Sequence, residues 1–437
     1  MRQKVFWIAA SCILAVVGLL PLASSGATPA SKEKVIYSFA GGTDGANPFS
    51  NLVADATGNL YGTTYFGGSP NCVGGCGTVF ELIHTKGGWQ HQVLYSFAGG
   101  TDGANPSAGM VFDKGSIYGT TSQGGDTSCS HGCGTVFELT QTKVGWKEQV
   151  IYIFTGGSDG TDPRGSVVFD DMGNLHGTAL YGGFYGGKGR CSSGCGTVFE
   201  LTHQAGGAWT ETTMYAFTDS SDGAFPSSVV LDPAGNAYGM AFAGGSTGSC
   251  THLGGCGVIY KLTPDSDGGW TESVPYTFGQ GGGFGIDPSG GLLLGEAGHL
   301  FGTCSRGGDG YGMVFELHDS QKNGWKQSNL HIFYGNPDGV NPEGGLVADS
   351  LGNLFGVTTQ GGAETGCYLG CGMVFELKRS QFGWRETILH SFGGTGDGAG
   401  PEAALILDSN GNLYGTTVQG GIGCGSYGCG TVYEITP

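Results

Sequence analysis

Short stretches rich in Val, Ile, Tyr, Phe, Trp and Thr alternate along the chain with clusters of glycine, asparagine and aspartate. This pattern is typical of β-strands bounded by turns, and no stretch sustains the 3.6-residue period of an amphipathic helix. The first set of such stretches predicts four strands, Leu52–Asp55, Asn59–Thr64, Thr78–Ile83 and Trp89–Phe97. Residues 55–59 and 86–88 have the composition of tight turns, so the strands pair as two hairpins.

The same set of strands recurs through the chain. A Gly-x-Val-Phe-Glu-Leu segment, or a close variant, occurs seven times at spacings of 55 to 62 residues. The copies begin at Gly77, Gly134, Gly196, Gly257, Gly312, Gly372 and Gly430. A Gly-Gly pair precedes each copy, at Gly67, Gly124, Gly182, Gly244, Gly307, Gly361 and Gly420. We therefore predict an all-β fold, a seven-bladed β-propeller of four-stranded blades.

The two ends of the repeat region complement each other. The last repeat stops at Pro437 and lacks a fourth strand of the kind seen at Trp384–Phe392, whereas Val35–Phe39 matches the end of such a strand. Six fourth strands carry a tryptophan, namely Trp89, Trp146, Trp209, Trp270, Trp325 and Trp384. We predict that the N-terminal strand completes the seventh blade, which closes the ring and removes its exposed edges.

The repeat unit Leu-Tyr-Gly-Thr-Thr, Gly-Gly, Cys-Gly-Thr-Val-Phe-Glu-Leu resembles the GloVer tandem repeat of exported bacterial proteins described as "choice-of-anchor". The resemblance covers roughly residues 35–437. It implies a secreted or surface repeat protein and no established activity. The order of Gly-Gly, aromatic residue and tryptophan is also loosely similar to kelch repeats, whose period of about 50 residues is shorter.

The N-terminal segment has the features of a targeting sequence. Arg2 and Lys4 precede the apolar run Val5–Leu22, and small residues around Ala27 offer a cleavage site. We predict a signal peptide at residues 1–27, a short linker at 28–34 and a single propeller at 35–437, with secretion to the periplasm, the cell surface or the medium. An uncleaved anchor is the alternative, because the apolar run is nearly long enough to span a bilayer.

Composition and charge narrow the classes of partner. Glycine and proline together supply 106 of 437 residues, close to the level of disordered chains, but 11% aromatic residues provide side chains for a core. The net charge of −18 becomes −20 without the leader. A surface with this negative charge repels phosphate backbones, which excludes nucleic acid as a partner. No later stretch is apolar enough to cross a membrane, and we expect a monomer.

Twelve cysteines form close pairs, one pair in each of six repeats. They are Cys72 and Cys76, Cys129 and Cys133, Cys191 and Cys195, Cys250 and Cys256, Cys367 and Cys371, and Cys424 and Cys429. In an exported protein such local pairs indicate disulfides. Metal binding is the competing interpretation, but each pair offers only two of the four ligands of a zinc site. Cys304 has no such neighbour and is predicted to be a buried thiol.

In a propeller, the links between strands two and three and the links between blades share one face. These longer links carry the cysteine pairs and an Asp-Gly-x-x-Pro segment, so we expect function on this face. The segment begins at Asp44, Asp102, Asp159, Asp222, Asp338 and Asp397. Aspartate suits the turn as a cap for its own loop. The alternative is calcium, although one carboxylate per link is few for an ion that takes 6–8 oxygens. We expect no other cofactor.

Glutamates recur once per blade in the third strands, at Glu81, Glu138, Glu200, Glu316, Glu376 and Glu434. Catalytic carboxylates must converge on one bond, and residues spread around a ring do not. We interpret these glutamates as structural. His176 stands alone at a position that is tyrosine in the first repeat, and we expect it to be packed.

The repeats differ most at the residue after the proline of this segment. The series is Phe49, Ser107, Arg164, Ser227, Ser289, Glu343 and Glu402. In a seven-membered ring blade three lies opposite blades six and seven, so Arg164 would face Glu343 and Glu402 across the channel mouth. The same face would carry Lys188, Arg190 and Arg306. One hypothesis is a polar pocket for a carboxylated or hydroxylated ligand; the alternative is a set of solvated surface charges.

These features favour an extracytoplasmic binding or scaffold propeller for a glycan or a protein. Aromatic residues of the long links, Tyr65, Phe66, Phe184, Tyr185, Tyr368 and Tyr427, could stack on sugars or pack on neighbouring loops. A carbohydrate-active lyase or hydrolase at the channel mouth is the alternative, by analogy of fold. A purely structural surface protein is a third interpretation.

Overall fold

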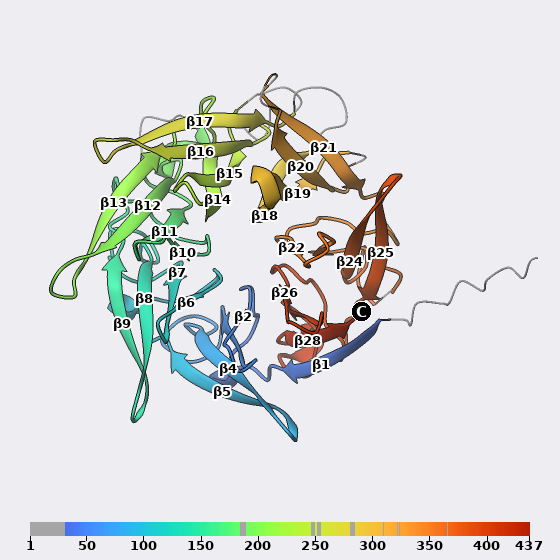
Figure 1. Ribbon diagram of the computed structural model, residues 1–437. Coiled ribbons are helices and arrows are strands. Elements are labelled where there is room, and N and C mark those ends of the chain that lie inside the picture. Colours follow the sequence, from blue (N-terminus) through green and yellow to red (C-terminus); the bar gives the residue numbers. More distant parts are fainter. Residues whose placement is uncertain are drawn as a thin grey trace, which may run out of the picture. The chain divides into compact units, whose positions relative to one another are not determined.

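The computed structural model describes residues 31–183, 189–245, 250, 255–279, 285–308, 310–320, 322, 324–364 and 366–437, and for residues 189 and 190 the backbone alone. The predicted signal peptide and Cys12 lie outside these residues. The unit Ser31–Pro437 consists of seven four-stranded antiparallel sheets in a ring, which confirms the predicted seven-bladed β-propeller (Figure 1).

Six blades are built from four consecutive strands each. They are β2 (Val53–Ala54), β3 (Leu60–Thr64), β4 (Thr78–Thr85) and β5 (Gly88–Ser96); β6 (Val111–Asp113), β7 (Ser116–Thr121), β8 (Thr135–Thr142) and β9 (Gly145–Ile153); β10 (Val168–Phe169), β11 (Leu175–Ala179), β12 (Thr197–His203) and β13 (Trp209–Ala216); β14 (Ala224–Leu231), β15 (Ala237–Ala243), β16 (Val258–Pro264) and β17 (Trp270–Thr277); β18 (Ile286–Leu294), β19 (Leu300–Arg306), β20 (Met313–Asp319) and β21 (Trp325–Ile332); β22 (Val347–Ala348), β23 (Leu354–Thr358), β24 (Met373–Ser380) and β25 (Gly383–Ser391). Short 3-10 turns lie at η1 (Gly42–Asp44), η2 (Gly100–Asp102), η3 (Gly189–Ser193), η5 (Glu296–Gly298) and η6 (Gly425–Tyr427).

The seventh blade joins the two ends of the propeller unit. Its strands β26 (Ile406–Leu407), β27 (Leu413–Thr417) and β28 (Thr431–Thr436) are completed by β1 (Lys32–Ser38), in the order β1-β28-β27-β26. Val35 lies opposite Tyr433 and Tyr37 opposite Val432, so the predicted closure is confirmed. The strand begins earlier than expected, because Lys32 and its neighbours also pair with β28; residues 32–34 are therefore strand rather than linker.

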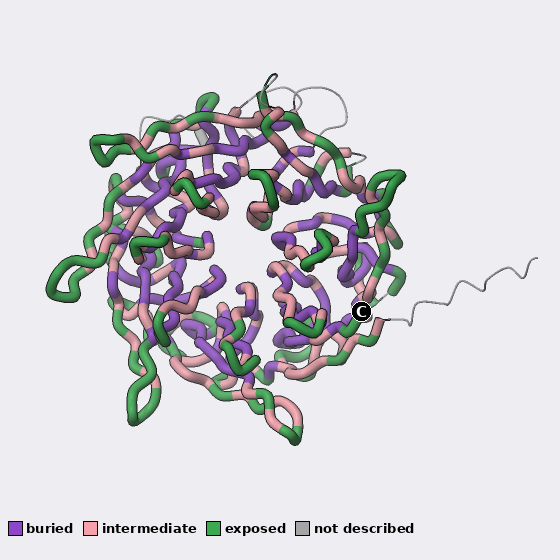
Figure 2. The backbone as a smooth tube through the Cα atoms, viewed as in Figure 1, coloured by how far each residue is buried: buried purple, intermediate pink, exposed green. Residues whose placement is uncertain are grey.

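The core consists of clusters packed between neighbouring blades. At each of the seven junctions the phenylalanine directly after a fourth strand meets the third-strand aromatic ring of the next blade, edge to face. Phe39 with Phe80 and Phe97 with Phe137 are examples, both with 5.1 Å between ring centroids. Phe39 follows directly after β1 and is fully buried, so the end of the closing strand continues this packing around the ring. Figure 2 shows buried backbone within the blades and exposed backbone at the hairpin tips. The blades are therefore held together by interdigitating aromatic side chains.

The long links also pack on one another. Gly75, beside the first cysteine pair, has a φ of +98°, and a Cβ atom there would lie 2.2 Å from the carbonyl oxygen of Gly67. Gly58, in a hairpin turn, has a similar φ of +86° but open space around it.

We expect Gly75→Ala to lower the free energy of unfolding by about 3 kcal/mol, because it combines backbone strain with a clash against rigid backbone. Gly58→Ala serves as the matched control and should cost about 1 kcal/mol, from the backbone strain alone. Urea denaturation of both variants measures the difference. Equal losses would mean that the link has room to move.

All six predicted cysteine pairs form disulfides, and Cys304 is a buried free thiol, as predicted. The Cys72–Cys76 bridge packs against Gly99 of the following link, where a Cβ atom would lie 3.0 Å from the Cys72 sulfur. The bridges thus fasten each strand-two link beside the next inter-blade link. Six disulfides are typical of proteins outside the reducing cytoplasm. Within the described residues no helix has the length and apolar character to cross a membrane.

Candidate functional site

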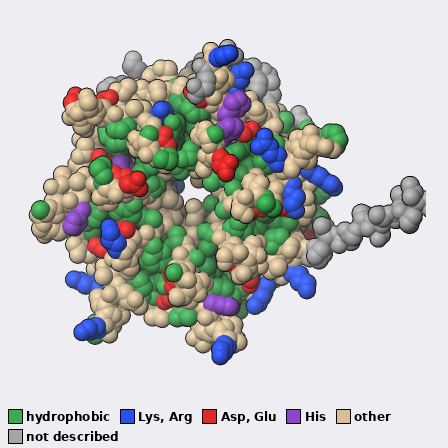
Figure 3. All heavy atoms as spheres, viewed as in Figure 1, with side chains coloured by type: hydrophobic (Ala, Val, Ile, Leu, Met, Phe, Trp, Pro, Cys, Tyr) green, Lys and Arg blue, Asp and Glu red, His purple; other side chains and the backbone are tan. Residues whose placement is uncertain are grey.

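The innermost strands of the blades lie around the centre of the ring (Figure 1), and the space-filling view shows a hollow there (Figure 3). Two cavities adjoin there, because Arg164, Ser227 and Gly290 line both. We call the larger one, of about 770 Å³, the mouth cavity and the smaller one, of about 120 Å³, the axial cavity. The seven symmetry-breaking residues all line one or both of them, namely Phe49, Ser107, Arg164, Ser227, Ser289, Glu343 and Glu402.

The three charged residues of this series all line the two central cavities, and Arg164 forms no ion pair with either glutamate. Arg164 lines both cavities, Glu343 the mouth cavity and Glu402 the axial cavity. The closest partner of Arg164 is Asp162 of its own link, with 2.8 Å between Nε and Oδ1. The local partner holds the guanidinium because it lies only two residues away, so no bond crosses the axis to either glutamate.

Both central glutamates have unusual titration. Burial raises the pKa of Glu402 to about 7, with a further contribution from the nearby charge of Glu343. Burial also raises the pKa of Glu343, and the positive charge of Arg306 opposes this shift. Arg306 is itself 3.6 Å from Asp287 and largely exposed. The side chains of the other two predicted basic residues, Lys188 and Arg190, lie outside the described residues.

Hydroxyl groups and aromatic rings complete the walls. The Oγ atoms of Ser107, Ser227 and Ser228 are buried and have no hydrogen-bond partner among the described residues. Tyr181 and Phe225 line the mouth cavity with ring centroids 5.5 Å apart, beside Phe242. The site therefore presents apolar faces together with the charged groups of Arg164 and Glu343, and unpaired hydroxyl groups lie beneath its surface.

Phe225 is the residue that the sequence reasoning missed. It precedes Pro226 and has a φ of +61°, a conformation that costs a bulky residue energy. The equivalent positions before the proline also have positive φ, and they hold residues that tolerate it, namely Asn47, Asn105, Asp162, Asp287, Asn341 and Gly400. The sequence therefore contained a signal for this site, because phenylalanine replaces Asn, Asp or Gly at this position of one repeat.

The recurring carboxylates serve the scaffold. Each aspartate of the Asp-Gly segments accepts a hydrogen bond from the backbone N–H four residues earlier, at 2.5 to 2.8 Å. They therefore cap their turns, as the first of the two interpretations predicts. Third-strand glutamates also act within their blades: Tyr61 donates to Glu81 and Tyr118 to Glu138, both at 2.8 Å.

The remaining candidates fall into two groups. Tyr65 packs against Phe49 and Phe66 and so belongs to the neighbouring loops, whereas Tyr368 and Tyr427 are exposed. Phe184 and Tyr185 lie outside the described residues. His176 is buried, with its two ring nitrogens 3.3 Å from Asp170 and Met214, as expected of a packed histidine.

A closed ring of seven blades, with its elaborate links around a central cavity, defines the chain as a β-propeller repeat protein. The family model of the Gloeobacter/Verrucomicrobia repeat matches residues 27–253 and 249–437, so the chain belongs to this family and the resemblance to the GloVer repeat is confirmed. No curated protein matches the chain by sequence.

Several solved structures are similar to this chain at low identity. An ancestral GH74 enzyme is 12% identical over 90% of this chain and 51% of its own, with a TM-score of 0.49. A protein from Lactobacillus plantarum is 14% identical over 81% and 94%, with a TM-score of 0.48. Trypanosoma rangeli sialidase is 10% identical over 93% and 59%, with a TM-score of 0.43. Each likeness is one of fold.

Proposed function

We propose that this chain is an extracytoplasmic binding protein whose mouth cavity binds a hydroxyl-rich glycan. The observation that carries the proposal is Phe225, a bulky ring held in left-handed backbone at the wall of this cavity. Strained residues cluster at binding sites, where the surrounding structure maintains them. The six disulfides support the location, since they need an oxidising compartment.

The chemistry of the cavity suits a sugar. Tyr181, Phe225 and Phe242 offer apolar faces on which a pyranose ring can stack. Ser289 and Glu343 can exchange hydrogen bonds with hydroxyl groups, and Arg164 can donate to a carboxylate or hydroxyl oxygen. The volume of about 770 Å³ lies within the range of small-molecule sites.

We expect Phe225→Asn to weaken glycan binding at least about tenfold without lowering the melting temperature, because asparagine removes the ring and tolerates the backbone. Arg164→Ala should also weaken binding. A glycan array first identifies the ligand, and calorimetry compares the variants, with Lys114→Ala on a hairpin turn as the control. Unchanged affinity in both site variants would contradict the proposal. Absence of glycan binding would favour a protein partner or a purely structural role.

A carbohydrate-active enzyme is the second candidate, favoured by the raised pKa values of Glu343 and Glu402 beside Arg164. Adjacent carboxyl groups of unequal acidity can act as acid and base in glycoside cleavage. Turnover assays on plant and microbial polysaccharides separate the two candidates. An enzyme would lose turnover but keep substrate binding in Glu402→Gln, whereas a binding protein shows no turnover in any variant.

A further inference from the structure

A cluster of three side chains recurs at the junctions between neighbouring blades. Each cluster contains a ring from the fourth strand of one blade, the aspartate of the following link, and a fourth-strand residue of the next blade. We call these clusters junction triads. The described triads with a carboxylate at the third position are Tyr95, Asp102 and Glu148; Tyr152, Asp159 and Glu211; Tyr215, Asp222 and Glu272; His331, Asp338 and Glu386; and His390, Asp397 and Glu33.

Tyrosine occupies the ring position in three of these triads and completes the hydrogen bonding of the aspartate. In the first, the Tyr95 hydroxyl donates to Oδ1 of Asp102 at 2.6 Å, and the Ala98 N–H donates to Oδ2. The other two tyrosines donate to their aspartates in the same way. A tyrosine therefore places a hydrogen-bond donor at the ring position and no imidazole nitrogen.

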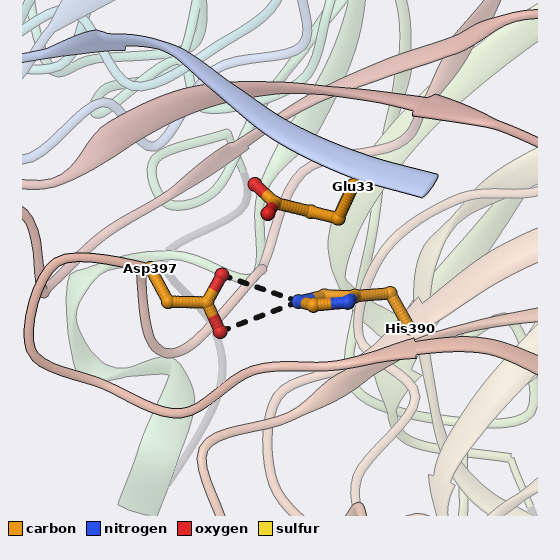
Figure 4. Close-up of side chains that lie close together, drawn as sticks. All are labelled: Glu33, His390 and Asp397. Carbon is orange, nitrogen blue, oxygen red and sulfur yellow. Dashed lines mark hydrogen bonds and ion pairs between the residues drawn. The ribbon is translucent and has the colours of Figure 1, made fainter. Parts of the chain in front are cut away.

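Histidine replaces tyrosine in the last two triads and brings a ring nitrogen between two carboxylates. His331 Nε2 lies 3.4 Å from Oδ1 of Asp338 and 3.9 Å from Oε1 of Glu386. His390 Nε2 lies 3.2 Å from Oδ1 of Asp397. In each triad the three potential ligand atoms lie within 4.8 Å of one another. Figure 4 shows Glu33, His390 and Asp397 turned toward one another.

The glutamates of these two triads lack other partners. Oε1 of Glu33 and Oε1 of Glu386 are buried and have no hydrogen bond to any described residue. Each aspartate uses one oxygen to cap its turn, with Tyr334 N donating to Asp338 and Gly393 N to Asp397. Each triad thus directs two carboxyl groups and one imidazole at a common point, and it contains no lysine or arginine.

We propose that each of these two histidine triads binds a divalent transition-metal ion, with zinc as the best fit. Zinc takes imidazole nitrogen and carboxylate oxygen at about 2.0–2.2 Å, so neighbouring ligand atoms in a tetrahedral site lie about 3.4 Å apart. Three of the histidine–carboxylate separations, 3.2 to 3.9 Å, lie near this value, and the other pairs of ligand atoms lie within 4.8 Å, so a small movement of the side chains would bring all three groups to the ion. Water would supply the fourth ligand. Calcium fits less well, because it prefers a full set of oxygens.

A third histidine with two carboxylates shows by contrast what the proposal requires. His176, Asp170 and Glu200 also lie close together. Asp170 already accepts bonds from Met172 N, Asn174 N and Asn174 Nδ2, at 2.8 to 2.9 Å. This aspartate is saturated as the cap of a hairpin turn, so we assign no ion to it.

The two ions would strengthen the closure of the ring. His331 and Glu386 belong to β21 and β25, so the first ion would join blades five and six. Glu33 belongs to β1, and His390 to β25, so the second would tie the closing strand to blade six. Metal binding to the folded form alone raises the stability of that form.

Calorimetric titration of the EDTA-treated chain with ZnCl₂ tests the proposal. We expect two ions per chain in the wild type, one in His331→Tyr or His390→Tyr, and none at these sites in the double variant. Tyrosine is the matched substitution, because three other triads hold it at the same position. Excess zinc should raise the melting temperature of the wild type by about 5 °C and leave that of the double variant unchanged.

Tyr95→His supplies the converse test, because Asp102 and Glu148 already stand beside that position. It should raise the stoichiometry to three. Glu33→Gln with Glu386→Gln should lose both ions while retaining the histidines, which covers the case of a tyrosine variant that folds poorly. An unchanged stoichiometry in the histidine and glutamate variants would assign the zinc to other histidines and overturn the proposal, as would a wild type that takes up no zinc.

Discussion

A chain that lacks residues 31–39 is expected to lose its cooperative fold and to aggregate at temperatures at which the complete propeller is soluble. These residues form β1, which covers the edge of β28 from Lys32 opposite Thr436 to Ser38 opposite Thr431. Without β1 the backbone groups of that edge would be open to pairing with another chain.

Truncation of residues 31–39 also removes a side chain from the core. Phe39 is fully buried and packs on Phe80 of blade one, so truncation removes the aromatic contact that joins the last blade to the first. Loss of a buried phenylalanine alone costs about 3–5 kcal/mol, a large part of the stability of a domain. The junction between blades seven and one would then lose both the pairing of β1 with β28 and the contact between the aromatic rings of Phe39 and Phe80.

Size-exclusion chromatography and thermal unfolding measure this effect. A chain that begins at Ser31 is the control, because it keeps the whole of β1, and it should remain monomeric with an unchanged melting temperature. A truncated chain that is equally monomeric and melts at the same temperature would show that the ring does not depend on its first strand.

The propeller is expected to be more stable at pH 5 than at pH 8. The glutamates of the tyrosine triads are partly buried beside aspartates. Burial and the charge of Asp102 raise the pKa of Glu148 to about 7, and burial raises those of Glu211 and Glu272 to about 6. The folded protein therefore holds protons that the unfolded chain has already released above its usual carboxyl pKa of 4.5.

The sign follows from proton linkage. Stability falls with rising pH wherever the folded state binds more protons than the unfolded state. The contribution of these carboxyl groups is complete below about pH 4.5 and is lost as the pH rises through 6 to 7. A full unit of pKa shift corresponds to about 1.4 kcal/mol, and partial exposure reduces this to about 1 kcal/mol for each glutamate. The three together should lower stability by about 3 kcal/mol.

Two buried histidines have the opposite effect on the pH dependence of stability. Burial lowers the pKa of His91 and His331, so each contributes stability that is lost as the pH falls below 6.5. Comparison of the wild type with a triple glutamate variant cancels the effect of the histidines, because both proteins contain them. Glu148→Gln, Glu211→Gln and Glu272→Gln copy Gln327, which accepts the hydroxyl of Tyr276 at 2.8 Å in the equivalent position. Urea denaturation between pH 5 and 8 should show a flatter dependence of stability on pH in this variant. Identical profiles would contradict the protonation of these glutamates in the folded state.

The fold was accessible from the sequence because each repeat carries the same local signals. The strands around Leu60–Thr64 and Thr78–Thr85 begin and end within two residues of expectation, since glycine-rich turns bound them. The closure was accessible because Val35–Phe39 matches a missing fourth strand. Only its start differed, as Lys32 carries no pattern that marks it as strand.

The central site could be predicted in part from the sevenfold repeat symmetry. Counting blades around a ring was sufficient to gather Arg164, Glu343 and Glu402 at the axis. The bond from Arg164 to Asp162 depends on a local side-chain geometry that periodicity does not contain. Phe225 could have been found, because it replaces Asn, Asp or Gly at a recurring position.

The histidine triads could not be predicted from the sequence pattern. Glu33 and His390 stand near opposite ends of the chain, and they meet only because β1 pairs with β28 in one particular register. A shift of one residue would turn Glu33 to the other face of the sheet. Sites of this kind require the closed ring before their members can be recognised.

The closure itself can be measured directly by cross-linking. Lys34 lies opposite Glu434, and Cβ atoms of directly opposed residues in antiparallel strands are about 4.5–5.5 Å apart. In a chain carrying Lys34→Cys and Glu434→Cys, a short bis-maleimide should join the two ends, and mass spectrometry should recover the linked peptides in high yield. A control with Lys34→Cys and Lys114→Cys, on different blades, should give no link. Absence of the 34–434 link, or equal yield in the control, would contradict a propeller closed by its own first strand.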